Sequence, residues 1–214
     1  MIKCVIVSQQ GSGTNLLRSF LNSHPDIYIA DEIFSNSKKF KYYKKYIDNP
    51  IKEYLNEFFE SGNNFDKFDT NQHKGGYIPK IFGFDLKYNN IVDNPEIFDW
   101  LATNNPKIIH LYRCKGRTFL RGMNKENKAT LSYDQFEEHI KFVNTWQDYF
   151  EYHFSQGDPK YYMKLNYEDM TRGEEINELP LKVEHNLLNF LGVRYQKLKI
   201  NPERIRNGKL RMRY

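Results

Sequence analysis

A glycine-rich turn near the amino terminus carries the residues best suited to binding an anion. The segment QQGSGTN follows the apolar run KCVIVS at residues 3–8 and precedes a helical pattern from Leu16 to Asn22. A strand, a glycine turn and a helix start can hold a phosphate, because the first N–H groups of a helix lack partners and carry the positive end of its dipole. Gly11 and Gly13 let the backbone approach an anion closely, and Ser12 and Thr14 add hydroxyl donors. The alternative is a tight turn with no ligand.

The turn lacks the lysine of a nucleotide-hydrolysing P-loop. That loop has the pattern G-x-x-x-x-G-K-[ST], whereas Gly13 here is followed by Thr14, Asn15 and Leu16. Without the lysine and a matching acidic strand that binds magnesium, the sequence disfavours an ATPase or an ordinary kinase.

Two short segments after the turn offer groups for proton transfer. Asp31 and Glu32 follow the strand candidate IYIAD at 27–31, and either carboxylate could instead cap the next helix. His24 stands before Pro25, where a helix stop is the alternative to catalysis. No cluster of residues has the spacing of a metal site, so we expect no metal.

The chain alternates strand and helix patterns along its length, which predicts a parallel α/β sheet with helices on both faces. The expected strands are 3–8, 27–31, 79–88, 107–112 and 160–165, and the expected helices are 16–22, 35–60, 95–103, 115–128, 133–155 and 184–191, the last ending at Gly192.

Length and charge limit the classes of protein. The 214 residues fit one domain, 1–214, and the net charge of +5 suits polyanionic small molecules without requiring nucleic acid. The segment KKFKYYKKY at 38–46 is either a nucleic-acid patch or a solvated helix with its rings in the core. No apolar stretch is long enough for a signal peptide or a membrane span, and we therefore expect a cytoplasmic protein.

The segment VIVSQQGSGTNLLRSFLNSHPDI at 5–27 resembles the amino-terminal signature of sulfotransferases, in particular carbohydrate and bacterial ones. The resemblance implies a three-layer, P-loop-like sulfotransferase fold in which the loop binds the 5'-phosphosulfate of 3'-phosphoadenosine 5'-phosphosulfate (PAPS). The match covers Ser12, Gly13, Thr14 and Asn15. Gly11 stands where the family usually has a lysine or arginine that touches the transferring group.

A second segment, KIIHLYRCKGRTFLR at 107–121, is similar to the family's 3'-phosphate motif. Arg113 matches the motif arginine at the end of the strand, where ligands of α/β sheets bind. Arg121 stands where the family has a serine, and an arginine there could also meet a phosphate.

Further segments match in family order, namely IFGFDLKY at 81–88, NYEDM at 166–170 and NFLGV at 189–193. The position of Glu32 after His-Pro-Asp and a strand is similar to that of the family's catalytic base. The resemblance therefore implies Glu32 as the general base. His24 is the second candidate by its residue type alone.

Together with the resemblance, these observations predict a PAPS-dependent sulfotransferase that acts on a hydroxyl acceptor, either a carbohydrate or a small hydroxylated molecule. If the basic segment 38–46 borders the acceptor site, it would attract an acidic acceptor such as an acidic glycan. The product would be 3'-phosphoadenosine 5'-phosphate (PAP), and residues 35–78 would form an insert on the acceptor side. A phosphotransferase that uses ATP and a non-catalytic nucleotide- or nucleic-acid-binding protein are the alternatives.

Overall fold

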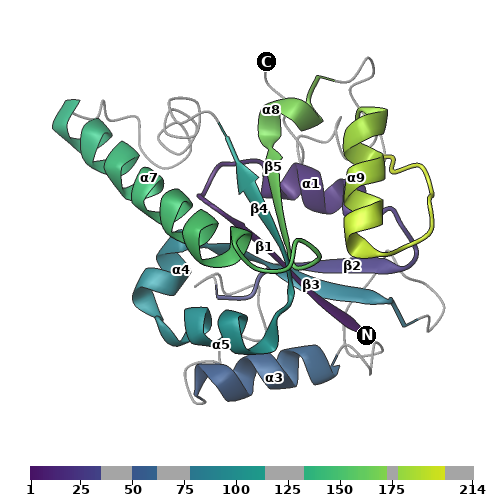
Figure 1. Cartoon of the computed structure of the whole chain (residues 1–214), viewed down its shortest axis with the longest axis horizontal. Coiled ribbons are helices and arrows are strands. Elements are labelled where there is room, and N and C mark those ends of the chain that lie inside the picture. Colours follow the sequence, from purple (N-terminus) through teal and green to yellow (C-terminus); the bar gives the residue numbers. More distant parts are fainter. Residues whose placement is uncertain (35–49, 62–77, 114–132, 173–177, 201–214) are drawn as a thin grey trace.

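The computed structural model describes residues 1–34, 50–61, 78–113, 133–172 and 178–200, which build a parallel sheet between two layers of helices (Figure 1). The strands are β1 (Ile2–Ser8), β2 (Ile27–Glu32), β3 (Ile81–Lys87), β4 (Lys107–Tyr112) and β5 (Tyr162–Asn166). They lie in the order β2-β3-β1-β4-β5, and all neighbouring strands are parallel. The predicted α/β fold is confirmed.

The central strand β1 explains why its sequence is a continuous apolar run. Cys4 and Ile6 belong to the hydrophobic cluster on one face of the sheet, and Val5 and Val7 belong to the cluster on the other. All four side chains are fully buried. A parallel strand covered on both faces needs apolar residues at every position, because neither face meets water.

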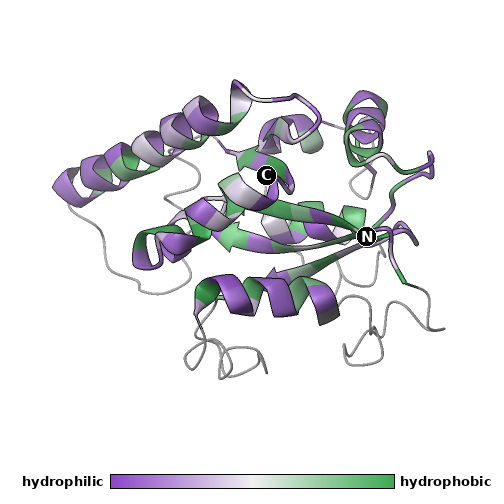
Figure 2. Ribbon diagram, turned by 60° about the horizontal axis from the view of Figure 1, so that its bottom comes forward, coloured by the Kyte–Doolittle hydropathy of each residue, from purple (hydrophilic) through white to green (hydrophobic). Residues whose placement is uncertain are grey.

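Helices cover both faces of this sheet. The first cluster includes residues of α1 (Thr14–Leu21) and α9 (Leu181–Leu191), and the second those of α3 (Ile51–Ser61), α4 (Tyr88–Asp93), α5 (Glu96–Asn104) and α7 (Tyr133–Ser155). In Figure 2 the strands are mainly green, whereas each helix shows green and purple residues. None of the described helices has both the length and the apolar composition needed to cross a membrane.

Most of the predicted elements are present where the structure describes the chain. All five strands are confirmed, and α9 ends at Gly192 in the left-handed conformation, with φ of 74°. The predictions missed α4 and the single-turn α8 (Tyr167–Met170), because each is too short to show a helical period. The helix predicted at 115–128, most of the predicted loop 61–78 and residues 35–49 lie outside the described residues.

The pairing of β1 with β3 generates a prediction. Gly83 lies opposite Cys4, and a Cβ atom at Gly83 would come within 2.0 Å of the Cys4 carbonyl oxygen. Gly83→Ala should therefore lower the free energy of unfolding by about 1–3 kcal/mol, the usual cost of overpacking. Denaturant titration measures the change. The control is Gly157→Ala, whose new Cβ would have its nearest neighbour at 3.7 Å; equal stability of the two variants would contradict the prediction.

Candidate functional site

The carboxyl ends of the parallel strands bring the candidate residues to one edge of the sheet. The glycine loop follows β1, Glu32 ends β2, Lys87 ends β3 and Arg113 follows β4. This edge is where ligands bind in open α/β sheets. Four segments that are distant in sequence therefore meet at the place expected for a ligand.

The glycine loop has the backbone geometry of an anion site. Gly11 and Gly13 adopt positive φ values of 83° and 98°, in the left-handed region where side chains are disfavoured. Gly13 is the N-cap of α1, with no side-chain cap and no acidic residue in the first helical turn. Alternation of left-handed and ordinary residues directs successive N–H groups into one concavity. The positive end of α1 thus has no negative side chain of its own first turn to neutralise it.

Two residues from later segments of the chain, Arg113 and Tyr167, pack against the loop. The Arg113 guanidinium lies 4.0 Å from the centre of the Tyr167 ring, and its Nη1 donates a hydrogen bond of 2.9 Å to the Gly11 carbonyl. Tyr167 also covers Gly13, where a Cβ atom would lie 2.3 Å from the ring. Arg113 therefore reaches the glycine loop from the end of β4. Arg121, its predicted companion, lies outside the described residues.

Lys87 is a second cation that lies against the loop. Its Nζ donates to Thr14 Oγ1 at 2.8 Å, to Ser8 Oγ at 3.1 Å and to both carboxylate oxygens of Asp85 at 2.7 and 2.8 Å. Lys87 and its partners are all buried. A buried charge needs this dense hydrogen bonding to offset its loss of water. One ammonium group thus joins β1, β3 and the first residue of α1.

An irregularity in β2 brings Glu32 to the same place. Ala30 pairs with Phe84, but the next pair is Glu32 with Asp85, so Asp31 is an extra residue in β2. Such a bulge changes which way the following side chain points. Glu32 Oε1 lies 3.8 Å from Lys87 Nζ, and Glu32 is partly exposed. It can therefore reach both the buried ammonium and a ligand in solvent.

The two neighbouring carboxyl groups have opposite pKa shifts. Burial raises the pKa of Glu32, with Asp85 and Asp31 adding to the rise while Lys87 and Arg18 oppose it. Burial would also raise the pKa of Asp31, but the hydrogen bond and charge of Arg18 outweigh it, and that pKa is lowered. Arg18 forms an ion pair with Asp31. Glu32 is thus the better proton acceptor of the two, since Asp31 holds its charge more strongly.

In the described part of the chain, a cluster of three carboxylates could hold a metal ion, and its members are Asp31, Glu32 and Asp85. Their carboxylate oxygens lie within 4.8 Å of one another. Two of these carboxylates already face Lys87, and the third faces Arg18. The negative charge of this cluster is therefore already balanced by two side-chain cations, Lys87 and Arg18.

His24 is enclosed in the fold rather than directed at this edge. It is fully buried; its Nδ1 accepts from the Asp26 amide at 3.0 Å, and its Nε2 lies 3.0 Å from the Arg194 carbonyl oxygen. Nδ1 thus stabilises the local turn before β2, and Nε2 joins the end of α1 to the segment after α9. The geometry is that of a helix stop.

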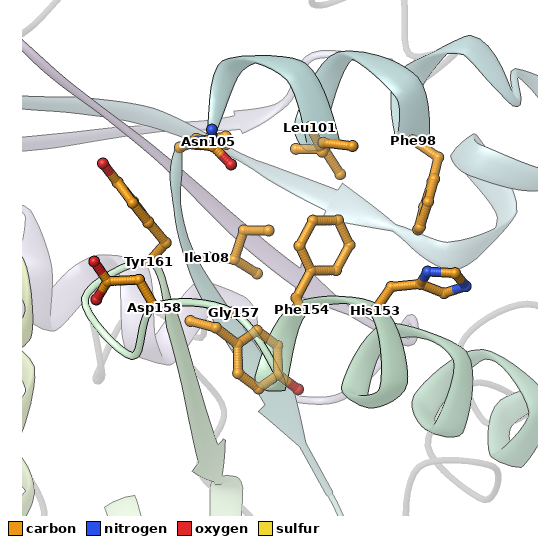
Figure 3. Close-up of a pocket in the computed structure, with 12 residues that line it drawn as sticks. Phe98, Leu101, Asn105, Ile108, His153, Phe154, Gly157, Asp158 and Tyr161 are labelled. Atoms are coloured by element: carbon orange, nitrogen blue, oxygen red, sulfur yellow. The ribbon is translucent and has the colours of Figure 1, made fainter.

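A separate pocket of about 180 Å³ lies at the opposite end of the sheet (Figure 3). Asn105, Pro106 and Tyr161 precede or begin β4 and β5 there, and Phe98 and Phe154 extend into it from α5 and α7. It is remote from the glycine loop, because the loop follows the carboxyl end of β1 and all five strands are parallel. The pocket contributes no residue to the candidate site.

Sequence reasoning did not assign Lys87, Asp85, Tyr167 or Arg18 to the site. One signal was available for the first two, since a strand buried on both faces carried two charged residues two positions apart and therefore on the same face. Tyr167 and Arg18 gave no such signal, because their contacts depend on the packing of α8 and α1.

Comparison with known proteins gives similar structures but no similar sequences. No family model and no curated protein matches the chain. A sulfotransferase from Alicyclobacillus acidocaldarius has a TM-score of 0.57 at 17% identity, over 93% of this chain and 84% of that one. The sulfotransferase domain of an olefin synthase from Synechococcus PCC 7002 has a TM-score of 0.53 at 19% identity, over 92% of this chain and 74% of that one. A mouse sulfotransferase in complex with PAP has a TM-score of 0.51 at 15% identity, over 91% of this chain and 59% of that one. The chain has the P-loop-like α/β fold that these sulfotransferases share.

Proposed function

We propose that the chain is a sulfotransferase that moves a sulfuryl group from PAPS to a hydroxyl group of an acceptor. The observation that carries the proposal is the convergence of an anion-binding glycine loop, a partly exposed Glu32 and a buried Lys87 at one edge of the sheet. These are a donor site, a base and a cation within reach of one transferring group. The shared fold supports the same assignment.

The donor would bind along the glycine loop. The N–H groups at the start of α1, with the side chains of Ser12, Thr14 and Asn15, would hold the 5'-phosphosulfate, because anions bind favourably at a helix start. Arg113 would meet the 3'-phosphate, since its guanidinium already lies beside the loop. Arg121 is proposed as a second contact to that phosphate.

Lys87 would supply the positive charge that Gly11 does not. Its Nζ lies 2.8 Å from Thr14 Oγ1, on the loop that would hold the phosphosulfate. A cation there stabilises the negative charge that develops on the bridging oxygen as the sulfur–oxygen bond breaks. The missing basic residue of the loop is then replaced from a neighbouring strand.

The reaction would transfer one group and one proton. The acceptor oxygen forms a bond to sulfur while the bond from sulfur to the bridging oxygen of the phosphate breaks, and PAP leaves with that electron pair. Glu32 takes the proton of the acceptor hydroxyl, a role for which its raised pKa suits it. His24 is assigned a structural role, because both of its ring nitrogens face other parts of the fold.

A carbohydrate is the proposed acceptor class, on the resemblance of residues 5–27, and of the position of Glu32, to carbohydrate sulfotransferases. The predicted acceptor insert, 35–78, is described in part. Its helix α3 packs into the core through Tyr54, Phe58 and Phe59, so this helix supports the sheet. The basic segment 38–46 lies outside the described residues.

Nucleotide selection tests the proposal. PAP should stabilise the protein by about 2.7 kcal/mol at one hundred times its dissociation constant, because it binds only the folded chain. Thermal melting with PAP, ATP, NAD and S-adenosylmethionine measures this, and transfer of labelled sulfate from PAPS to a panel of glycans tests catalysis. A shift with ATP and none with PAP would reject the sulfotransferase assignment. Binding of PAP without transfer to any acceptor would favour a non-catalytic nucleotide-binding protein.

Arg113 can be tested with two ligands that differ by one phosphate. Arg113→Ala should weaken binding of PAPS by about 1.5–3 kcal/mol more than binding of adenosine 5'-phosphosulfate, which lacks the 3'-phosphate. Some loss is expected for both, since Arg113 also bonds to Gly11. Calorimetry on both ligands isolates the difference. Equal losses would restrict Arg113 to holding the loop.

Glu32→Gln should lower turnover by roughly 10²–10⁴-fold while leaving the affinity for PAP almost unchanged, because the amide keeps the shape and loses the basicity. The unprotonated carboxylate is the active form. A raised pKa therefore predicts that kcat/KM of the native enzyme rises with pH through a midpoint above the ordinary glutamate value, and that this rise is lost in the variant.

Asp31→Asn is the matched control for this variant, because it neutralises the adjacent carboxylate, which is held by Arg18. Its turnover should fall much less than that of Glu32→Gln. If Glu32→Gln melted earlier than the native protein but still transferred sulfate at a similar rate, Glu32 would be a structural residue and not the base.

A further inference from the structure

The oxygen atoms around Lys87 form a cation site that the chain fills with its own side chain. Five contacts surround the ammonium nitrogen: two carboxylate oxygens of Asp85, the hydroxyls of Thr14 and Ser8, and Glu32 Oε1 at 3.8 Å. Asp85 and Ser8 are fully buried, and Lys87 is 5% exposed. Oxygen ligands of this kind, carboxylates and hydroxyls, are also those that hard metal ions prefer.

The placement of two of these ligands matches how P-loop enzymes hold magnesium. In nucleotide-hydrolysing P-loop proteins, a loop hydroxyl and an aspartate from a neighbouring strand hold the ion that bridges the nucleotide phosphates. Here the loop hydroxyl is that of Thr14, and the aspartate is Asp85 on the strand beside β1. The ammonium of Lys87 bonds to both of these groups, at 2.8 Å from Thr14 Oγ1 and 2.7 Å from Asp85 Oδ1.

Lys87 is fixed at this point by its surroundings. It ends β3 and is the N-cap of α4, where its own N–H donates to Asn90 Oδ1 at 3.0 Å. The next residue, Tyr88, is fully buried. If the ammonium moved away, Asp85 would remain as a buried and unpaired charge, which is strongly unfavourable.

We propose that Lys87 is a built-in cation that takes the place of a divalent metal and selects against magnesium-bound nucleoside triphosphates as donors. This inference rests on the proposed function, because it explains which donor the site admits. PAPS needs no metal to bind beside an ammonium group. A magnesium-bound triphosphate would bring a second, divalent cation to the position of the first, and the two would repel each other.

Removal of the ammonium should expose the metal site. Lys87→Ala should bind Mn²⁺, measured from the electron paramagnetic resonance signal of the free ion, whereas the native protein should not. Adding Asp85→Asn to that variant should weaken the binding by more than the roughly 10–100-fold that loss of an outer-shell partner costs, because Asp85 would bind the ion directly. The matched control is Lys80→Ala, which also removes a lysine from a buried aspartate, since Lys80 Nζ lies 3.0 Å from Asp26. Mn²⁺ binding by Lys80→Ala would overturn the proposal, as would its absence in a folded Lys87→Ala protein.

A second measurement uses the native protein and does not require that Lys87→Ala fold. ATP should displace PAP less effectively when Mg²⁺ is present than when it is absent, because the complexed ion meets Lys87. Stronger displacement with Mg²⁺ would overturn the proposal. The Mn²⁺ experiment contains no nucleotide, so it separates the two hypotheses. Failure of PAP to bind, with the expected Mn²⁺ results, would reject the proposed function and leave the role of Lys87 standing.

Discussion

The buried pair of Asp85 and Lys87 is the interaction on which the geometry of the candidate site depends. Lys87 Nζ lies 2.7 Å from Asp85 Oδ1, and the exposed fractions of the two side chains are 6% and 0%. Attraction within a buried pair does not by itself offset the removal of two charges from water, so such a pair needs further hydrogen bonds. The hydroxyls of Ser8 and Thr14 provide them. Because these partners belong to β1, β3 and the start of α1, the pair fixes the loop, the strand beside it and the helix together.

The same pair determines the electrostatic setting of Glu32. The bulge at Asp31 pairs Glu32 with Asp85 and directs it toward the ammonium group. Burial and the neighbouring carboxylates raise its pKa, while Lys87 limits the rise. With its pKa raised while that of Asp31 is lowered, Glu32 is the better proton acceptor of the two acidic residues at the end of β2. The pKa of Asp31 is lowered instead, because the hydrogen bond and charge of Arg18 outweigh the effect of burial. Two adjacent acidic residues therefore differ in pKa because their charged partners differ.

The sequence predicts the parts of this arrangement that are local. The strands are recognisable because burial on both faces requires apolar runs, and the glycine loop because positive φ at Gly11 and Gly13 requires glycine. Glu32 was named from its place after a strand, but its bulge was not predicted. Lys87 was missed as a site residue, although its strand was predicted, because its partners lie as far as 79 positions away in the chain. Contacts between residues so far apart in the sequence depend on the order of the strands in the sheet, and the periodicity of the sequence does not reveal that order.

The loop also depends on a residue from the far end of the fold. Tyr167 begins α8, directly after β5, and its ring occupies the space that a side chain at position 13 would fill. The same ring also contacts the guanidinium of Arg113, which bonds to the Gly11 carbonyl. Both glycines of the loop are thus constrained by β4 and β5, on one side of β1, whereas Thr14 is constrained by β3 on the other. The sheet order β2-β3-β1-β4-β5 places the loop strand in the centre, so Lys87 at the end of β3 contacts the loop from one side and Arg113, after β4, contacts it from the other. A loop held from both sides can present its N–H groups to an anion without reorganisation, which is the property that a site for group transfer requires.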